Sequence, residues 1–213
     1  MSSKHHNPID RFIASADKAL RVISGVASAS RPTPACHIPD TEMTEAEMKH
    51  SAGLMRVDHV GEVMAQALYN SQARFARTEE VRAQFERASR EEEDHLAWTA
   101  ERLKELNSQT SILAPLFYAG AYALGVAAAK MGDATSLGFV VETERQVEKH
   151  LDGHLLSLPP NDARSRAIVE QMRIDEIAHG KAAQDMGATQ TPMPVQLAMK
   201  AMSRVMTTTT YHI

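Results

Sequence analysis

Glu91-Glu92-Glu93-Asp94-His95 lies within a long helix-favouring run, and a related stretch, Asp175-Glu176-Ile177-Ala178-His179, occurs later in the chain. In both stretches a glutamate precedes a histidine by three positions, which places the two side chains on one helix face, one turn apart. A single pair is weak evidence, because acidic helix surfaces contain it by chance. Two copies are typical of carboxylate-bridged di-iron or di-manganese four-helix bundles, which also need one Glu from each of two other helices.

The two remaining glutamates occur at matching distances upstream. Glu62 lies 30 positions before Glu92, and Glu144 lies 32 positions before Glu176. A helical hairpin of about 15 residues up and about 15 back returns the chain to the same height. We therefore predict that Glu62 faces Glu92 and that Glu144 faces Glu176.

The third long helix offers two rivals, Glu142 and Glu148. Glu144 shares its helix face with an apolar stripe that includes Leu137 and Val141, whereas polar side chains surround Glu142. A buried face is the one that reaches a central site. Glu144 is therefore favoured, and Glu148 remains a weaker candidate.

Burying four carboxylates and two imidazoles requires positive charge between them. Two metal ions supply that charge, and hard carboxylate oxygens with imidazoles suit iron or manganese. We expect Glu92 and Glu176 to bridge the metals, and each histidine to bind one of them. The predicted metal ligands are Glu62, Glu92, His95, Glu144, Glu176 and His179.

The neighbouring polar residues divide into two groups. Glu91 and Asp175 are placed to orient a ligating imidazole, with ordinary surface charge as the alternative, and Glu93 and Asp94 are expected on the surface. Trp98 is expected to pack in the core. Three further histidines could bind metal, but the ligand set is complete without them, so we expect them around the site or on the surface: His59, His150 and His154.

Composition limits the class of protein. A chain of 213 residues fits one domain without disulfides, and its single cysteine, Cys36, excludes sites that need several thiolates. The net charge is −4 with both signs interspersed, so we expect no nucleic-acid partner. The first residues lack a signal-peptide pattern, which favours a cytosol-facing bacterial protein.

The chain divides into residues 1–43 and a domain over 44–213. The first part is an amphipathic helix over 8–24 followed by a linker or extended strap over 25–43, where no chemistry is expected and His37 is expected on the surface. Capping signals and turn residues predict the domain to be all-α, with Gly132 ending one helix and Asp133 capping the next. The 18 positions 112–129 carry no charge, so this helix is interpreted as a buried core helix, a membrane-contacting helix in the bilayer plane, or a span. The expected helices are 44–77, 79–106, 112–131, 133–158, 162–186 and a Met-rich segment 195–206.

Several of these motifs together resemble the demethoxyubiquinol hydroxylases of ubiquinone biosynthesis. They are Arg56-Val57-Asp58-His59-Val60-Gly61-Glu62, the run from Glu91 to Trp98, Glu144 with His150, and the stretch from Asp175 to His179. The resemblance covers residues 44–213, and the bacterial branch is similar at 8–34 as well. In that family the six iron ligands fall at the six positions predicted above. A role that some assign to a tyrosine of the last helix is not carried over to Tyr211.

The resemblance implies a ferritin-like four-helix bundle with additional hydrophobic, membrane-contacting helices. It implies a di-iron monooxygenase that hydroxylates the ring of 3-demethoxyubiquinol with O2, the penultimate step of ubiquinone biosynthesis, with electrons from the quinol or NADH. No catalytic residue is implied beyond the metal ligands. A polyprenylated quinol substrate implies a peripheral protein on the cytoplasmic side of the cell inner membrane. A homo-oligomer and a lipid-binding accessory protein are compatible with this interpretation.

Three other functions compete with this one. A ferritin-like iron-storage protein, or a manganese catalase or tRNA-modifying di-iron hydroxylase, would share the six ligands. A metal-free helical interaction module is the non-enzyme alternative, and it predicts that replacing Glu62 or Glu176 leaves function intact.

Overall fold

The computed structural model of the protein describes residues 17, 19–22 and 28–213, and within these ranges it contains helices and no strands. The all-α prediction is therefore confirmed for the described part of the chain. Of the expected helix 8–24, residues 17 and 19–22 are helical and Val22 is buried, and the rest lies outside the described residues, as do His5 and His6. The helices are α2 (Glu45–Phe75), α3 (Glu79–Glu105), α4 (Ala114–Lys130), α5 (Asp133–Ser157), α6 (Ala163–Asp185) and α7 (Met193–Thr210).

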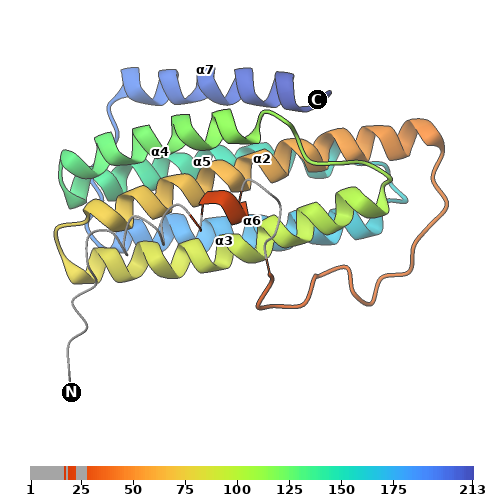
Figure 1. Ribbon diagram of the computed structural model, residues 1–213, viewed down its shortest axis with the longest axis horizontal. Helices are drawn as coiled ribbons and strands as arrows, with labels where there is room; N and C mark the ends of the chain where they lie inside the picture. Colours follow the sequence, from red (N-terminus) through yellow and green to blue (C-terminus); the bar gives the residue numbers. More distant parts are fainter. Residues whose placement is uncertain (1–16, 18, 23–27) are drawn as a thin grey trace.

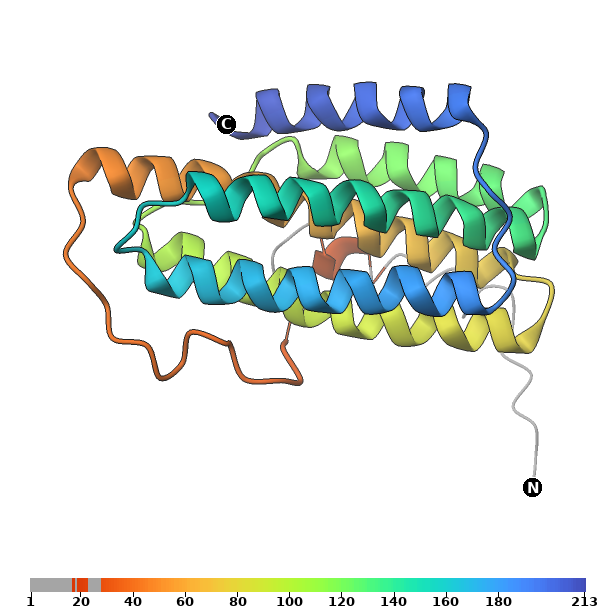
Figure 2. The same cartoon turned by 180° about the vertical axis from the view of Figure 1, so that it is seen from behind.

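Four long helices lie side by side as two antiparallel hairpins, α2 with α3 and α5 with α6 (Figures 1 and 2). Helix α4 packs along α2, and α7 lies over α4 and α5 as a separate outer layer. The predicted start of α2 is confirmed, because the Thr44 and Glu47 side chains each bind the other residue's backbone N–H in a capping box. The predicted helix ends agree with the structure to within a few residues, except that α7 is longer than the expected segment.

The connection before α5 differs from the prediction that Asp133 caps that helix. Gly132, with a φ of 116°, is the residue before α5, and Asp133 is already helical. The Asp133 carboxylate instead accepts the backbone N–H groups of Arg77 and Thr78, each at 2.9 Å, at the start of α3. Asp133 therefore joins the two hairpins at one end of the molecule.

Helix α4 buries one face against α2 and exposes the other. A Cβ on Gly125 would lie 2.0 Å from the Ser71 hydroxyl, so the missing side chain permits this close approach. Tyr118 and Ala121 share the buried face, while Leu116 is 68% exposed. The core interpretation of 112–129 holds for the face against α2, and the contact of the exposed face with a membrane stays a prediction. No helix in the described ranges has both the length and the apolarity to cross a bilayer.

The segment 28–43 is an extended strap, one of the two alternatives that the sequence left open, and not a free linker. Figures 1 and 2 show it running beside the bundle to the start of α2. Ala35 is buried, Arg164 donates to the Ile38 carbonyl at 2.7 Å, and the Ser30 backbone N–H donates to Asp94 at 2.6 Å. Asp94 is consequently buried rather than on the surface, whereas His37 is exposed as predicted. Docking against α3 and α6 is a tertiary effect that local composition does not reveal.

Candidate metal centre

The six residues predicted as metal ligands converge inside the bundle. They form two groups of four in which the candidate ligand atoms lie within 4.8 Å of one another. Glu92 and Glu176 belong to both groups, which is the arrangement expected of bridging ligands. The groups are Glu62, Glu92, His95 and Glu176, and Glu92, Glu144, Glu176 and His179, all of them buried.

The geometry of the imidazoles is suited to metal binding. His95 Nδ1 lies 3.1 Å from a Glu92 oxygen and 3.3 Å from a Glu176 oxygen. His179 Nδ1 lies 3.1 Å and 3.2 Å from oxygens of the same two glutamates. In both histidines Nδ1 therefore faces the shared carboxylates, and Nε2 faces away from them.

The outer nitrogens are held crosswise. His95 on α3 donates from Nε2 to Asp175 of α6 at 2.9 Å, and His179 on α6 donates from Nε2 to Glu91 of α3 at 2.6 Å. A carboxylate that accepts the outer N–H fixes the tautomer and leaves Nδ1 free to bind a metal. The predicted contacts of Glu91 and Asp175 with the imidazoles are confirmed, and each acid contacts the histidine of the other helix.

The electrostatics of the cluster are those of crowded carboxylates. Burial raises the pKa of Glu62 and of Glu144 well above the usual range, and a neighbouring glutamate raises each further. Burial opposes ionisation of Glu92 too, but His95 and His179 outweigh it and hold its pKa well below the usual range. Burial likewise opposes ionisation of Asp175, yet its partners lower its pKa to about 2.

The donor set fits a pair of cations. Two buried carboxylate oxygens, Oε2 of Glu62 and Oε1 of Glu92, have no hydrogen-bond partner. Buried acceptors without partners are costly, and like charges at this spacing repel, so a cation between the groups would relieve both penalties.

Tyr69 is a residue of the site that sequence reasoning missed. Its hydroxyl donates to Glu144 Oε1 at 2.5 Å, and the ring is buried. Tyr69 lies seven positions after Glu62, two turns along α2 on the same face, and this spacing was the available signal. The hydrogen bond fixes Oε1 of Glu144 and leaves Oε2 available to a metal ion.

The rival residues stay outside both groups. Glu142 is paired with Arg145 at 2.7 Å, and Glu148 is in neither cluster. Trp98 is buried in the core, as predicted, with its ring centre 5.4 Å from that of His95. His59 is buried without a hydrogen bond to either ring nitrogen, away from both groups.

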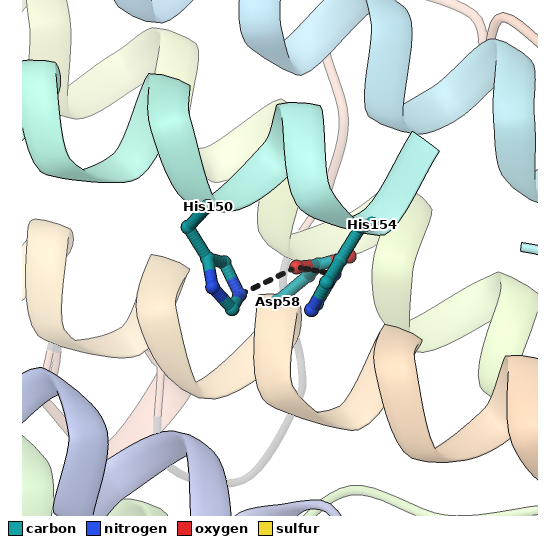
Figure 3. Close-up of side chains that lie close together, drawn as sticks. All are labelled: Asp58, His150 and His154. Atoms are coloured by element: carbon teal, nitrogen blue, oxygen red, sulfur yellow. Dashed lines mark ion pairs between the residues drawn. The ribbon is translucent and has the colours of Figure 1, made fainter. Parts of the chain in front are cut away.

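His150 and His154 of α5 instead surround Asp58 of α2 (Figure 3). His154 Nδ1 lies 2.7 Å, and His150 Nε2 3.6 Å, from Asp58 Oδ1. Burial opposes ionisation of Asp58, but these two imidazoles hold its pKa below the usual range. The trio joins the two hairpins one turn along α2 from Glu62, and its ligand atoms also lie within 4.8 Å of one another, close enough to hold an ion. That these histidines lie outside the ligand set stays a prediction.

An apolar cavity of about 110 Å³ adjoins the centre between α2, α4, α5 and α7. Glu62, Asp58 and His150 contribute polar atoms to a wall that is otherwise mainly apolar. The Met-rich segment that the sequence singled out supplies much of the roof, including Met199, Met202 and Met206. An apolar molecule bound in this cavity would therefore lie beside Glu62, one of the candidate metal ligands.

Fold and site together define a helical protein with two adjoining carboxylate and histidine groups that could hold a pair of metal ions beside an apolar cavity. The sequence model of the family "Ubiquinone biosynthesis protein COQ7" matches residues 49–210. The chain belongs to this family, and the resemblance found in the sequence is confirmed.

Two bacterial relatives extend the comparison over almost the whole chain. A protein of Herminiimonas arsenicoxydans named 3-demethoxyubiquinol 3-hydroxylase is 62% identical over 207 residues, which are 97% of this chain and 98% of the relative. A protein of Herbaspirillum seropedicae with the same name is 63% identical over 205 residues, 96% of this chain and 99% of the relative.

Proposed function

We propose that the protein is a 3-demethoxyubiquinol 3-hydroxylase that uses two iron ions and O2 to hydroxylate the quinol ring in the penultimate step of ubiquinone biosynthesis. The observation that carries the proposal is the pair of buried groups that share Glu92 and Glu176 and adjoin an apolar cavity at Glu62. The relatives named for this activity support it over nearly their full length.

Iron is the metal that the donor set favours, with manganese next. Each group combines three carboxylates with one imidazole and contains no thiolate. Such hard, mixed oxygen and nitrogen donors suit iron and manganese better than copper or structural zinc. Each of the helical hairpins α2–α3 and α5–α6 contributes two glutamates and one histidine, which is the ligand pattern of a ferritin-like bundle.

When bound, the two irons would supply the redox chemistry that activates O2, with electrons taken from the quinol or from NADH. The chain itself supplies position and exclusion of water. Asp175 and Glu91 hold the imidazoles in one tautomer, and Tyr69 holds Glu144. The cavity would take the substituted ring in a mainly apolar surrounding, with Glu62 in its wall to bring the ring close to the centre.

The protein would work on the membrane surface, because a polyprenylated quinol resides in the bilayer. The outer faces of α4 and α7, the two helices that cover the cavity, carry exposed apolar side chains. Exposed apolar patches of this kind mark interaction sites with membranes or partners. We place it peripherally on the cytoplasmic side of the cell inner membrane, where a homo-oligomer or a lipid-binding accessory protein could also contact this surface. The exposed side chains are Ile112, Leu116, Met131, Met193, Leu197 and Val205.

The decisive test is complementation of a ubiquinone-deficient strain with wild type and Glu92→Ala, with quinone intermediates measured by mass spectrometry. We expect wild type to restore ubiquinone, and Glu92→Ala, which removes a residue common to both groups, to accumulate the demethoxy intermediate. Glu148→Ala on α5 is the matched control, because this glutamate is in neither group. Equal ubiquinone levels with Glu92→Ala and wild type would refute a metal role for the cluster.

Membrane attachment needs a separate test. In a liposome flotation assay with anionic vesicles, we expect wild type to float, and a variant with Leu116→Ser and Leu197→Ser to remain in solution. Both residues are well exposed, so folding should be unaffected, and circular dichroism checks this. Wild type that stays entirely in solution contradicts the membrane part of the proposal.

A further inference from the structure

Arg31 connects the segment 28–43 to the metal centre. Its Nε donates to Asp94 at 2.6 Å, and its Nη2 lies 2.9 Å from Asp175 Oδ2. The same Asp175 oxygen accepts the Nε2–H of His95 at 2.9 Å. One carboxylate oxygen therefore stands between the guanidinium and a candidate metal ligand. Arg31 lies outside residues 49–210, the part of the chain that the family model matches.

We propose that Arg31 is a positioning residue that fixes the His95 imidazole through Asp175 and thereby strengthens metal binding selectively at the position that includes His95. This inference rests on the proposed function, because it assumes that the two groups bind metal. It goes further in making the two metal positions unequal and in giving the segment before α2 a part in the centre.

The guanidinium is held from several sides rather than extended into solvent. The Ser30 hydroxyl and backbone N–H both donate to Asp94, the carboxylate that also accepts from Arg31. The Trp98 indole donates to the Arg31 carbonyl at 3.3 Å, and the guanidinium carbon lies 4.9 Å from the centre of the Trp98 ring. Cation–π contact and paired carboxylates restrict the rotamers of Arg31, so its charge has a defined place.

The guanidinium acts on His95 by fixing the carboxylate between them. Asp175 binds Gln171 through its other oxygen at 2.9 Å, so without Arg31 only that amide and His95 would orient it. A carboxylate fixed by a guanidinium keeps one oxygen aimed at Nε2 and keeps Nδ1 aimed at the metal position. Loss of this support would leave the ligand present but less well placed.

The second metal position has a different outer layer. His179 donates to Glu91, whose side chain is 50% exposed, whereas the Asp175 side chain that supports His95 is only 13% exposed. Water competes for an exposed carboxylate and weakens its hold on a partner. The His95 position is therefore the better supported of the two, and Arg31 contributes to that support through its contact with Asp175.

The test compares metal release from Arg31→Met, Arg31→Lys and wild type, each loaded anaerobically with Fe²⁺ and then challenged with a coloured chelator. Substitutions of groups that orient metal ligands cost about 10- to 100-fold in metal affinity. We expect one of the two irons to leave Arg31→Met about 10- to 100-fold faster than wild type, and the other at an unchanged rate. Arg31→Lys keeps the charge but cannot contact both Asp94 and Asp175 as the guanidinium does. Its release rate should lie between those of wild type and Arg31→Met.

Two further variants show which position is affected. In a His179→Ala background, which keeps the His95 position, Arg31→Met should again accelerate iron release. In a His95→Ala background, where Arg31 has no imidazole to position, it should have no further effect. This is a double-mutant cycle between Arg31 and each histidine.

Arg164→Met is the matched control. Arg164 anchors the same segment at Ile38, away from Asp175, so this variant loosens the segment without touching the centre. Its iron release should match wild type. Equal acceleration by Arg164→Met, or equal acceleration of both irons by Arg31→Met, would overturn the inference. Wild type that binds no iron would instead refute the proposed function, so the two failures are distinguishable.

Discussion

Replacing Glu144 with Gln should stabilise the metal-free protein and destabilise the metal-loaded one. The amide has the shape of the carboxylate, its oxygen can still accept the Tyr69 hydroxyl, and its NH2 group can donate to a neighbouring carboxylate. The substitution therefore removes charge while keeping the packing of the cluster.

The magnitude follows from the spacing of the ligand atoms. Two unit charges 4.8 Å apart interact with about 3.5 kcal/mol at an effective dielectric constant of about 20. The carboxylates of Glu92 and Glu176 repel the Glu144 charge, and the imidazolium of His179 attracts it. The attraction offsets one of the two repulsions, so the net effect is that of one repelling charge. The folded protein can escape this repulsion by protonating Glu144. Protonating at pH 7 a carboxyl group whose ordinary pKa is about 4.3 costs about 3.7 kcal/mol, so the repulsion cannot cost more than that. We expect Glu144→Gln to raise the free energy of unfolding of the metal-free protein by about 3 kcal/mol at pH 7.

The gain should depend on pH in one direction. Because the pKa of Glu144 is raised in the folded state, the folded protein binds a proton that the unfolded chain releases above about pH 4.3. The penalty is thus present above that pH and disappears as pH falls. At pH 5 the gain should be about 1 kcal/mol or less.

With metal bound, Glu144→Gln should lower the free energy of unfolding instead of raising it. A free metal concentration about 100-fold above the dissociation constant stabilises the folded state by about 2.7 kcal/mol for each ion, and Gln is a poorer ligand than a carboxylate. The assay is urea unfolding followed by fluorescence of Trp98, next to His95 in the core, with chelator or with Mn²⁺. Glu148→Gln, on the same helix but outside both groups, keeps all six candidate ligands. Its difference in unfolding free energy from wild type should therefore be the same with chelator and with Mn²⁺. A destabilised metal-free Glu144→Gln at pH 7, or a gain that is equal at pH 5 and pH 7, would refute the reasoning.

Three further substitutions test the scaffold by urea unfolding of the metal-free protein. Burial lowers the pKa of His59 to about 4, so the contribution of His59 to wild-type stability should fall by about 2 to 3 kcal/mol between pH 6.5 and pH 4.5, and the difference between wild type and His59→Gln should change by that amount; parallel curves would contradict this. Asp162→Ala removes the buried partner of Arg102 at 2.8 Å and leaves Glu105, at 2.7 Å, as the nearest carboxylate, so it should cost about 1 to 3 kcal/mol, and no measurable cost would show that the pair is solvated. Gly138→Ala would set a Cβ 1.9 Å from the Thr189 carbonyl oxygen, and the forced shift should cost about 1 to 3 kcal/mol, whereas an unchanged midpoint would contradict this packing.

The six residues of the centre were accessible from sequence because helical spacing is a local rule. Two Glu-x-x-His pairs and two glutamates at hairpin distance determine which side chains converge once the helices form. Helix ends were accessible for the same reason, since Thr44 and its capping partner are three residues apart. The ligand role of the six remains a prediction, although their convergence is observed.

Interactions between distant segments were not accessible in this way. The contact of Arg31 with Asp94 joins residues 63 positions apart, and the pattern around Arg31 is that of an ordinary turn-rich linker. Asp133 was misassigned because a residue between two helix ends can cap either, and only the approach of α3 decided which. Tyr69 escaped because aromatic residues at helical spacing are usually core, and its hydroxyl becomes relevant only beside Glu144.

The crosswise support of the two histidines also bears on the order in which the protein matures. The group around His95 draws on α2, α3 and α6, and the group around His179 draws on α3, α5 and α6. Neither hairpin alone contains a complete set, and each histidine depends on an acid from the opposite hairpin. The two hairpins must therefore dock before either group could hold an ion. Metal binding would then follow folding and hold the docked hairpins together.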